Sequence, residues 1–195
     1  MQPKALREKI DKIDEMLAKF QNAVTDGNPV LDLPPANGLI AECQKDCFDI
    51  ADAIFKECQK KGIPAWIDGR SLLASCRTQN MLPWETALDI GMFEDGWDAA
   101  NADILAEIDC TAEKYSIKPK KKQKYGKICP VVNVKVWIKD AKTIHLVTDG
   151  MTAWSKESCI LPLQERILNG RAFASPANAW SILEAEYGSD WKKIV

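Results

Sequence analysis

The chain has 195 residues, of which 46% are hydrophobic and 28% charged. This length and composition suit one domain with one main core and exclude disorder as a description of the whole chain. The net charge of −2 gives no general attraction to nucleic acid or to an anionic membrane. No apolar run approaches the roughly 20 residues of a transmembrane segment, and residues 1–20 lack the apolar centre of a secretory signal.

The seven cysteines are odd in number and show no tight repeated spacing. That pattern argues against a disulfide framework and favours a reducing intracellular compartment, either the cytoplasm or an organelle matrix. Cys43, Cys47 and Cys58 fall in the apolar stripe of one predicted helix, and the chain has a single histidine, His145. We therefore expect these three cysteines to be buried, reduced thiols on the inner face of that helix, not zinc ligands.

The first predicted element is an amphipathic helix over residues 3–24, followed by a linker over 29–36. Its apolar residues are spaced so that they share one face: Leu6, Ile10, Ile13, Leu17, Phe20 and Val24. This face packs within the chain or contacts another protein subunit. The predicted organisation is therefore a helix over 1–28, a linker over 29–36 and a domain over 37–195.

The remaining elements follow in chain order. We predict helices over 37–61, 71–77, 98–108 and 176–187, strands over 63–67, 88–93, 131–138 and 143–147, and a hairpin over 163–173. Asn169-Gly170 forms the turn of that hairpin. Together these elements predict an α+β fold with a mixed sheet of about four or five strands and packed helices. The strands over 63–67, 88–93 and 131–138 are expected to be neighbours.

A lysine-rich run extends from Lys118 to Lys124. We expect it to form an exposed, solvated loop; its charge also allows contact with nucleic acid or another anionic surface. Among the tryptophans, Trp66, Trp84, Trp137 and Trp180 fit core positions, whereas Trp97, Trp154 and Trp191 are candidates for exposure.

The residues best suited to chemistry lie between 62 and 92. A strand there leads into Gly69 and Ser71 at the start of a helix, flanked by the cations Arg70 and Arg77. Glycine lets the backbone approach a phosphate, the hydroxyl donates a hydrogen bond, and a helix N-terminus presents free amides. Many folds contain such a turn without a ligand, so the pattern by itself is weak.

Two acids follow this turn, Glu85 and Asp89. Carboxylates at alternate positions of a strand point to one face, where they can hold Mg²⁺ between the phosphates of a nucleotide. The residue two before Asp89 is Ala87, so the alternating pair of acids is incomplete.

The whole block resembles the LicD family, which includes bacterial phosphocholine transferases and the fukutin-related transferases. That family shows a Gly-Gly-Thr-Leu-Leu-Gly-x-x-Arg run and then Pro-Trp-Asp-Asp-Asp-Ile-Asp. The residues that match at the same spacing are Gly69, Leu72, Leu73, Arg77, Pro83, Trp84 and Asp89. Residues 160–163, Phe173 and the segment 176–191 resemble the family's closing strand, helix and Tyr-Gly-x-x-Trp end. The resemblance covers roughly residues 37–191.

The resemblance implies a nucleotidyltransferase fold. It also implies an Mg²⁺-dependent transfer of phosphocholine or a polyol phosphate from a CDP-linked donor to a glycan hydroxyl. Gly69, Arg70, Ser71 and Arg77 would then bind the nucleotide phosphates. Glu85 and Asp89 would be the catalytic residues, with Asp89 also the metal ligand.

The chain departs from the family pattern at several of these positions. Arg70 stands where the family has a second glycine, Ala74 replaces another glycine, and Thr86 and Ala87 replace two clustered aspartates. Asn133 lies about where a third acid would come from a neighbouring strand.

Because an amide neither neutralises Mg²⁺ nor acts as a base, these departures favour a non-catalytic domain. We expect such a domain, which needs no cofactor, to serve as a structural or interaction subunit of a larger assembly. The alternatives are an active phosphotransferase and a regulator that binds a nucleotide without chemistry.

Overall fold

The structure is a computed structural model that describes residues 36, 38–120, 129–141, 143–146 and 154–193. The predicted helix over 3–24 lies outside these residues, as do nearly all of the linker and the second half of the lysine-rich run. Within the described ranges no helix is long and apolar enough to span a membrane.

The described helices and strands alternate along the chain. In order they are α2 (Gly38–Lys61), β1 (Ala65–Ile67), α3 (Gly69–Arg77), β2 (Ala87–Phe93), α4 (Glu94–Glu107), β3 (Cys110–Glu113), β4 (Ser116–Pro119), β5 (Val131–Asp140), β6 (Thr143–Leu146), β7 (Trp154–Ser155), β8 (Gln164–Leu168), β9 (Arg171–Ser175) and α5 (Ala179–Tyr187). Two short 3-10 turns lie at Glu157–Cys159, between β7 and β8, and at Trp191–Lys193, after α5.

The central sheet is mixed, as the sequence predicts. Its main path among the described strands is β1-β2-β5-β4-β3, with β2 parallel to β5 and the other pairs antiparallel. The second half of β5 pairs with β6, and β6 pairs with β7. The predicted neighbours β1, β2 and β5 are thus confirmed, and the fold is α+β.

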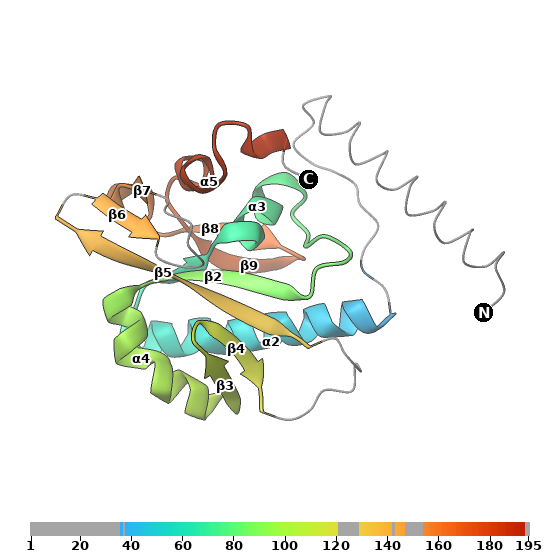
Figure 1. Ribbon diagram of the computed structural model, residues 1–195. Coiled ribbons are helices and arrows are strands. Elements are labelled where there is room, and N and C mark those ends of the chain that lie inside the picture. Colours follow the sequence, from blue (N-terminus) through green and yellow to red (C-terminus); the bar gives the residue numbers. More distant parts are fainter. Residues whose placement is uncertain (1–35, 37, 121–128, 142, 147–153, 194–195) are drawn as a thin grey trace, which may run out of the picture.

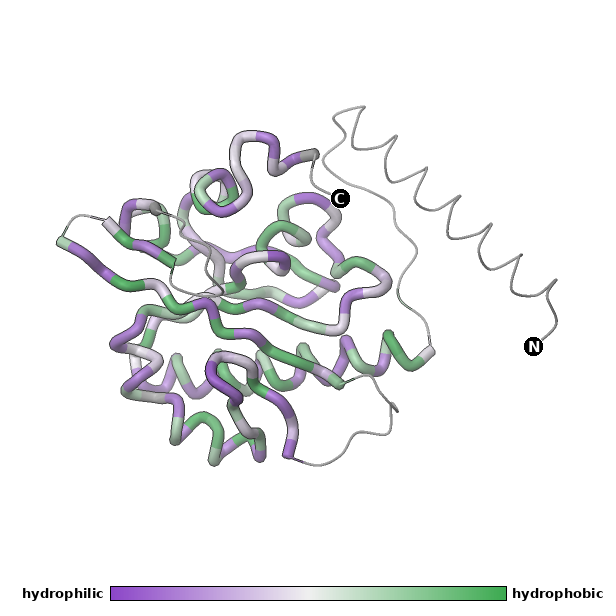
Figure 2. The backbone as a smooth tube through the Cα atoms, viewed as in Figure 1, coloured by the Kyte–Doolittle hydropathy of each residue, from purple (hydrophilic) through white to green (hydrophobic). Residues whose placement is uncertain are grey.

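Two layers cover the sheet (Figure 1). Helices α2 and α4 lie on one face, and α3 and α5 lie on the other. The β8–β9 hairpin lies beside β1, where β8 contacts α3 and β9 contacts α2. Hydrophobic and hydrophilic residues alternate along α2 (Figure 2), because this helix has one buried side. All residues of β2 after Ala87 are buried. The even-numbered residues of β2 and of the first part of β5 are buried in the main core: Leu88, Ile90, Met92, Val132, Val134 and Val136. Consequently the odd-numbered residues face α3 and α5.

The predicted cysteine stripe of α2 is confirmed. Cys43 and Cys47 are 0% exposed and Cys58 is 1% exposed. All seven cysteines lie in the described part of the chain, where each is a free thiol. The helix ends at Gly62, whose φ of +68° suits glycine because it has no Cβ.

Some elements differ from the sequence-based expectation. The hairpin β3–β4 is not predicted, because its strands are four residues long and carry few apolar side chains. Lys118 is part of β4, so the lysine-rich run begins in a strand. Helix α5 begins at Ala179, three residues later than predicted, because the Asn178 side chain caps it by accepting a hydrogen bond from the Ser181 amide at 3.1 Å.

The tryptophan assignment is partly wrong. Trp66 and Trp137 are buried as expected, but Trp84 is 44% exposed and Trp180 is 48% exposed. Trp84 lies in the loop before β2, and Trp180 projects from the start of α5 with its ring edge against Trp191. Two expected surface positions are in fact core positions, Trp97 and Trp191. The side chain of Trp154 is not among those described.

Candidate functional site

The site is built around the turn between β1 and α3. Asp68 caps α3: its Oδ1 accepts a hydrogen bond from the Gly69 amide at 2.9 Å. Its Oδ2 accepts a hydrogen bond from the Trp137 indole at 2.6 Å, and the side chain is fully buried. Burial and the nearby Glu186 raise the pKa of Asp68 to about 7, although Lys135 opposes that shift.

Asp89 lies directly beside this turn, on β2. Its carboxylate Oδ2 accepts hydrogen bonds from the Arg70 amide at 3.1 Å and from the Arg70 Nε at 3.3 Å. Its Oδ1 accepts a hydrogen bond from Asn133 Nδ2 at 2.9 Å. The predicted convergence of Gly69 and Asp89 is confirmed, because a Cβ on Gly69 would lie 2.9 Å from Asp89 Oδ2. The carboxylate is therefore engaged at both oxygens.

Asn133 occupies the position on β5 directly opposite Asp89 in the parallel register. The Ser116 hydroxyl from β4 donates to Asn133 Oδ1 at 3.0 Å. Because a carboxylate only accepts hydrogen bonds, the amide directs its Nδ2 at Asp89 and leaves its Oδ1 for the Ser116 hydroxyl. The amide thus serves as a hydrogen-bond donor to the acid and directs no oxygen toward it.

Arg70 links the two acids of the predicted site. Its Nη1 lies 3.3 Å from Glu85 and its Nε 3.3 Å from Asp89, while half of the side chain is exposed. Burial alone would lower the pKa of Arg70, but the carboxylates of Asp89 and Glu85 raise it above its usual value. Burial raises the pKa of Glu85, and Arg70 partly offsets this effect.

The remaining predicted phosphate ligands are held in the protein interior. Ser71 is buried and its Oγ accepts a hydrogen bond from the Asp89 amide at 2.7 Å, which joins α3 to β2. Arg77 lies two turns further along α3 and is also buried; burial lowers its pKa. The structure therefore gathers Gly69, Arg70, Ser71, Glu85 and Asp89 at one place. Arg77 lies further along α3 but lines one pocket together with Arg70, Ser71 and Glu85.

Two charged residues at this place are absent from the sequence-based prediction, Lys135 and Glu186. Lys135 Nζ donates a hydrogen bond to Glu186 Oε1, and the two side chains are 17% and 1% exposed. The period of two along a strand offers a signal for Lys135, because it lies on the same face of β5 as Asn133. Glu186 carries no such signal, since its position depends on how α5 packs.

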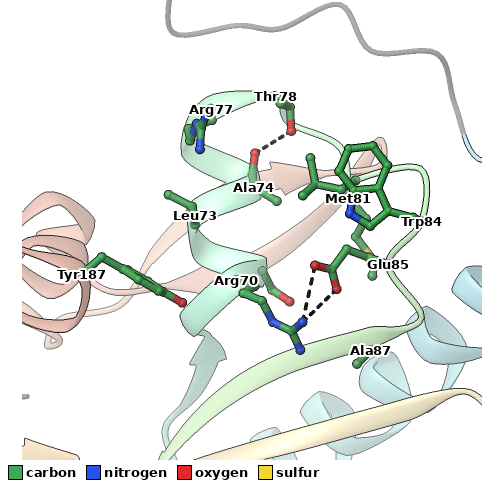
Figure 3. A pocket seen from close by; sticks show the side chains of 12 residues that line it. Arg70, Leu73, Ala74, Arg77, Thr78, Met81, Trp84, Glu85, Ala87 and Tyr187 are labelled. Carbon is green, nitrogen blue, oxygen red and sulfur yellow. Dashed lines mark hydrogen bonds and ion pairs between the residues drawn. The ribbon is translucent and has the colours of Figure 1, made fainter. Parts of the chain in front are cut away.

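A pocket of about 220 Å³ opens beside the site, between α3 and the loop before β2. Figure 3 shows Arg70 and Glu85 paired at one end, with Ala74, Met81 and Trp84 along its wall. A second hollow of about 570 Å³ lies toward the β3–β4 hairpin. Arg70 and Tyr187 line both, so they stand between the two spaces.

The mixed sheet, the glycine turn at a helix N-terminus and the acid on the adjacent strand together define a nucleotidyltransferase-type domain. Sequence comparison agrees: the LicD/FKTN/FKRP nucleotidyltransferase domain matches residues 62–178. This match covers more than half of the chain, which therefore belongs to the LicD family, a family of nucleotidyltransferase-type phosphotransferases. No curated protein matched the sequence.

Proposed function

We propose that this chain is a non-catalytic LicD-family domain that acts as a structural or interaction subunit of a larger assembly. The observation that carries the proposal is the state of Asp89, the acid of the family motif. Both of its carboxylate oxygens accept hydrogen bonds from donors of the chain itself, namely Arg70 and Asn133. A catalytic acid of this family would need those oxygens for a metal ion.

The family resemblance implies Mg²⁺ at this centre, but the donor set does not fit a divalent cation. Magnesium prefers several oxygen ligands in octahedral geometry, carboxylates among them. Ala87 offers no ligand, and Asn133 directs its amide nitrogen at Asp89. The cation Arg70 lies within 3.3 Å of the same carboxylate. In the described residues, no three His, Cys, Asp or Glu side chains are grouped so as to hold a metal ion.

The chemistry of phosphoryl transfer supports the same proposal. The donor phosphates and the departing group are anionic, so the transition state needs concentrated positive charge and a base for the acceptor hydroxyl. Arg70 supplies one fixed positive charge, already paired with Glu85 and Asp89. An arginine remains protonated and so cannot serve as the base. The domain therefore keeps the fold of the family without the charged groups that the transfer needs.

An interaction role is supported by two exposed tryptophans among the described residues, Trp84 and Trp180. Tryptophan is enriched at protein interfaces because it buries a large area with few rotatable bonds. We further propose that the apolar face of the segment 3–24 contacts another protein subunit. A variant that lacks residues 1–28 is then expected to keep one cooperative thermal unfolding transition and to lose association with that subunit. Loss of folding would instead assign the segment to the core.

The catalytic part is tested with the full chain, a CDP-linked phosphocholine or polyol-phosphate donor, and Mg²⁺ or Mn²⁺. We expect no CMP release above that of a buffer control. The double variant Ala87→Asp/Asn133→Asp is also expected to remain inactive, because Arg70 still occupies the turn. Metal-dependent turnover by the unmodified chain that is abolished in Asp89→Asn would overturn the proposal.

A further inference from the structure

The Lys135 side chain extends from β5 toward Asp89 through the space beside Gly69, where that residue has no side chain. A Cβ on Gly69 would lie 2.5 Å from Lys135 Cε and 2.9 Å from its Nζ. The same point is 2.9 Å from Asp89 Oδ2. The lysine ammonium and the Asp89 carboxylate therefore approach the first residue of α3 together, at the turn where the sequence suggests a phosphate site.

Three buried carboxylates surround this ammonium, each from a different element. Asp68 precedes α3, Asp89 lies on β2 and Glu186 on α5, and all three residues are buried. Lys135 donates a hydrogen bond to Glu186 Oε1, whereas Glu186 Oε2 has no hydrogen-bond partner among the described residues. Carboxylates held this far from water require a compensating cation or a proton.

The electrostatics keep Lys135 charged. Its burial alone would lower the pKa of the ammonium, but Glu186, Asp68 and Asp89 together raise it above the usual value. Arg70 compensates Asp89 from the solvent side. The cluster thus contains a cation of the chain itself. Lys135 extends from β5, donates to Glu186 on α5 and lies beside Gly69 at the start of α3.

We propose that the ammonium of Lys135 is the resident cation of this centre and stands in for the divalent ion that the family resemblance implies. It lies among the three carboxylates, donates the hydrogen bond to Glu186 that holds α5 against the sheet, and opposes the binding of Mg²⁺ by its positive charge. The inference rests on the proposed function in taking the centre to be free of metal. It adds that this place, where the family resemblance implies a metal ion, has a structural role, and that Lys135 holds its elements together.

The experiment uses the full chain and measures the thermal midpoint, Tm, with and without about 1 mM Mn²⁺. The variants are Lys135→Met, Glu186→Gln and the double variant. Methionine keeps most of the length of the lysine side chain and removes only its charge. The matched control is Lys139→Met on the same strand, whose exposed ion pair with Glu157 spans 3.0 Å.

We expect Lys135→Met to lower Tm by about 10 °C or more, because it leaves buried carboxylates without a counter-ion. The double variant is expected to recover part of that loss, since it also removes one of the uncompensated charges. Lys139→Met should change Tm by less than about 2 °C, as surface ion pairs contribute little. If Lys135→Met does not fold, the double variant still tests the idea: it must fold for the proposal to stand.

Manganese separates this inference from the proposed function. We expect no change in the Tm of the unmodified chain with Mn²⁺, whereas a site with a Kd of about 10 µM would raise it by several degrees. Such a rise would overturn Lys135 as the resident cation even if no transfer were detected. A double variant no more stable than Lys135→Met would overturn it too. Turnover of a CDP-linked donor without any Mn²⁺ response would refute the proposed function and leave the inference intact.

Discussion

Asp89 and Asn133 lie opposite each other on parallel strands, and the Asn133 amide donates a hydrogen bond to the Asp89 carboxylate at 2.9 Å. An aspartate in place of Asn133 would bring two carboxylates to this distance. The asparagine instead supplies a donor, which makes the pair a stable contact between β2 and β5.

Asn133→Asp is expected to lower the free energy of unfolding by about 2 kcal/mol at pH 7, because a donor is lost and like charges meet. One of the two acids would have a folded-state pKa above its unfolded value of about 3.9. The cost is therefore fully present above that raised pKa and disappears as the pH falls toward 4. Urea unfolding at pH 7.5 and 4.5 measures this change. Asn133→Ala serves as the control, since it should show a penalty with little dependence on pH.

The contact between Arg70 and Glu85 is expected to be weak. The two groups lie 3.3 Å apart, but the Arg70 side chain is 52% exposed, so water screens their attraction. A double-mutant cycle with Arg70→Met and Glu85→Gln should give a coupling energy of about 0.5–1 kcal/mol in the free energy of unfolding. A coupling of several kcal/mol would mean that the pair is enclosed more fully than the structure indicates.

Gly91 is expected to tolerate no side chain. A Cβ there would lie 2.2 Å from Trp66 Nε1 and 2.5 Å from Asp68 Oδ2, so Gly91→Ala forces the indole or the capping aspartate to move. We expect a loss of about 2–3 kcal/mol in the free energy of unfolding, measured with urea.

Gly170→Ala provides the comparison, because it has a φ of +72° and no atom within 4 Å of the added Cβ. It should cost about 1 kcal/mol, from backbone strain alone. Equal losses in the two alanine variants would show that steric conflict at Gly91 is unimportant.

The buried thiols are expected to resist alkylation and disulfide exchange. Burial raises the pKa of Cys47 to about 12 and that of Cys58 and Cys110 to about 11. The reactive thiolate is therefore a minor species at pH 8, well below these values. Iodoacetamide labelling followed by mass spectrometry should modify the half-buried Cys129 and Cys159 first. The buried thiols should react at the same rate as the others only in urea.

The sequence by itself determined the fold class and brought attention to the turn and strand that form the candidate site. The three-and-four spacing of α2 indicated which thiols are buried, and the apolar runs of β1, β2 and β5 indicated the central strands. Local signals were sufficient there, because periodicity reports directly which face of an element is turned away from water. The glycine turn and Asp89 also came from sequence, since their spacing is short and matches a family motif.

Tertiary structure decided what the site residues do. The sequence suggested amides at the start of α3 that are free to bind a phosphate, yet the amides of Gly69 and Arg70 donate to Asp68 and Asp89. The sequence predicted core positions for Trp84 and Trp180, but both side chains lie at the surface. Lys135 and Glu186 are 51 residues apart and meet only because α5 packs over the sheet. Such pairings depend on the packing of whole elements, so no local pattern of residues contains them.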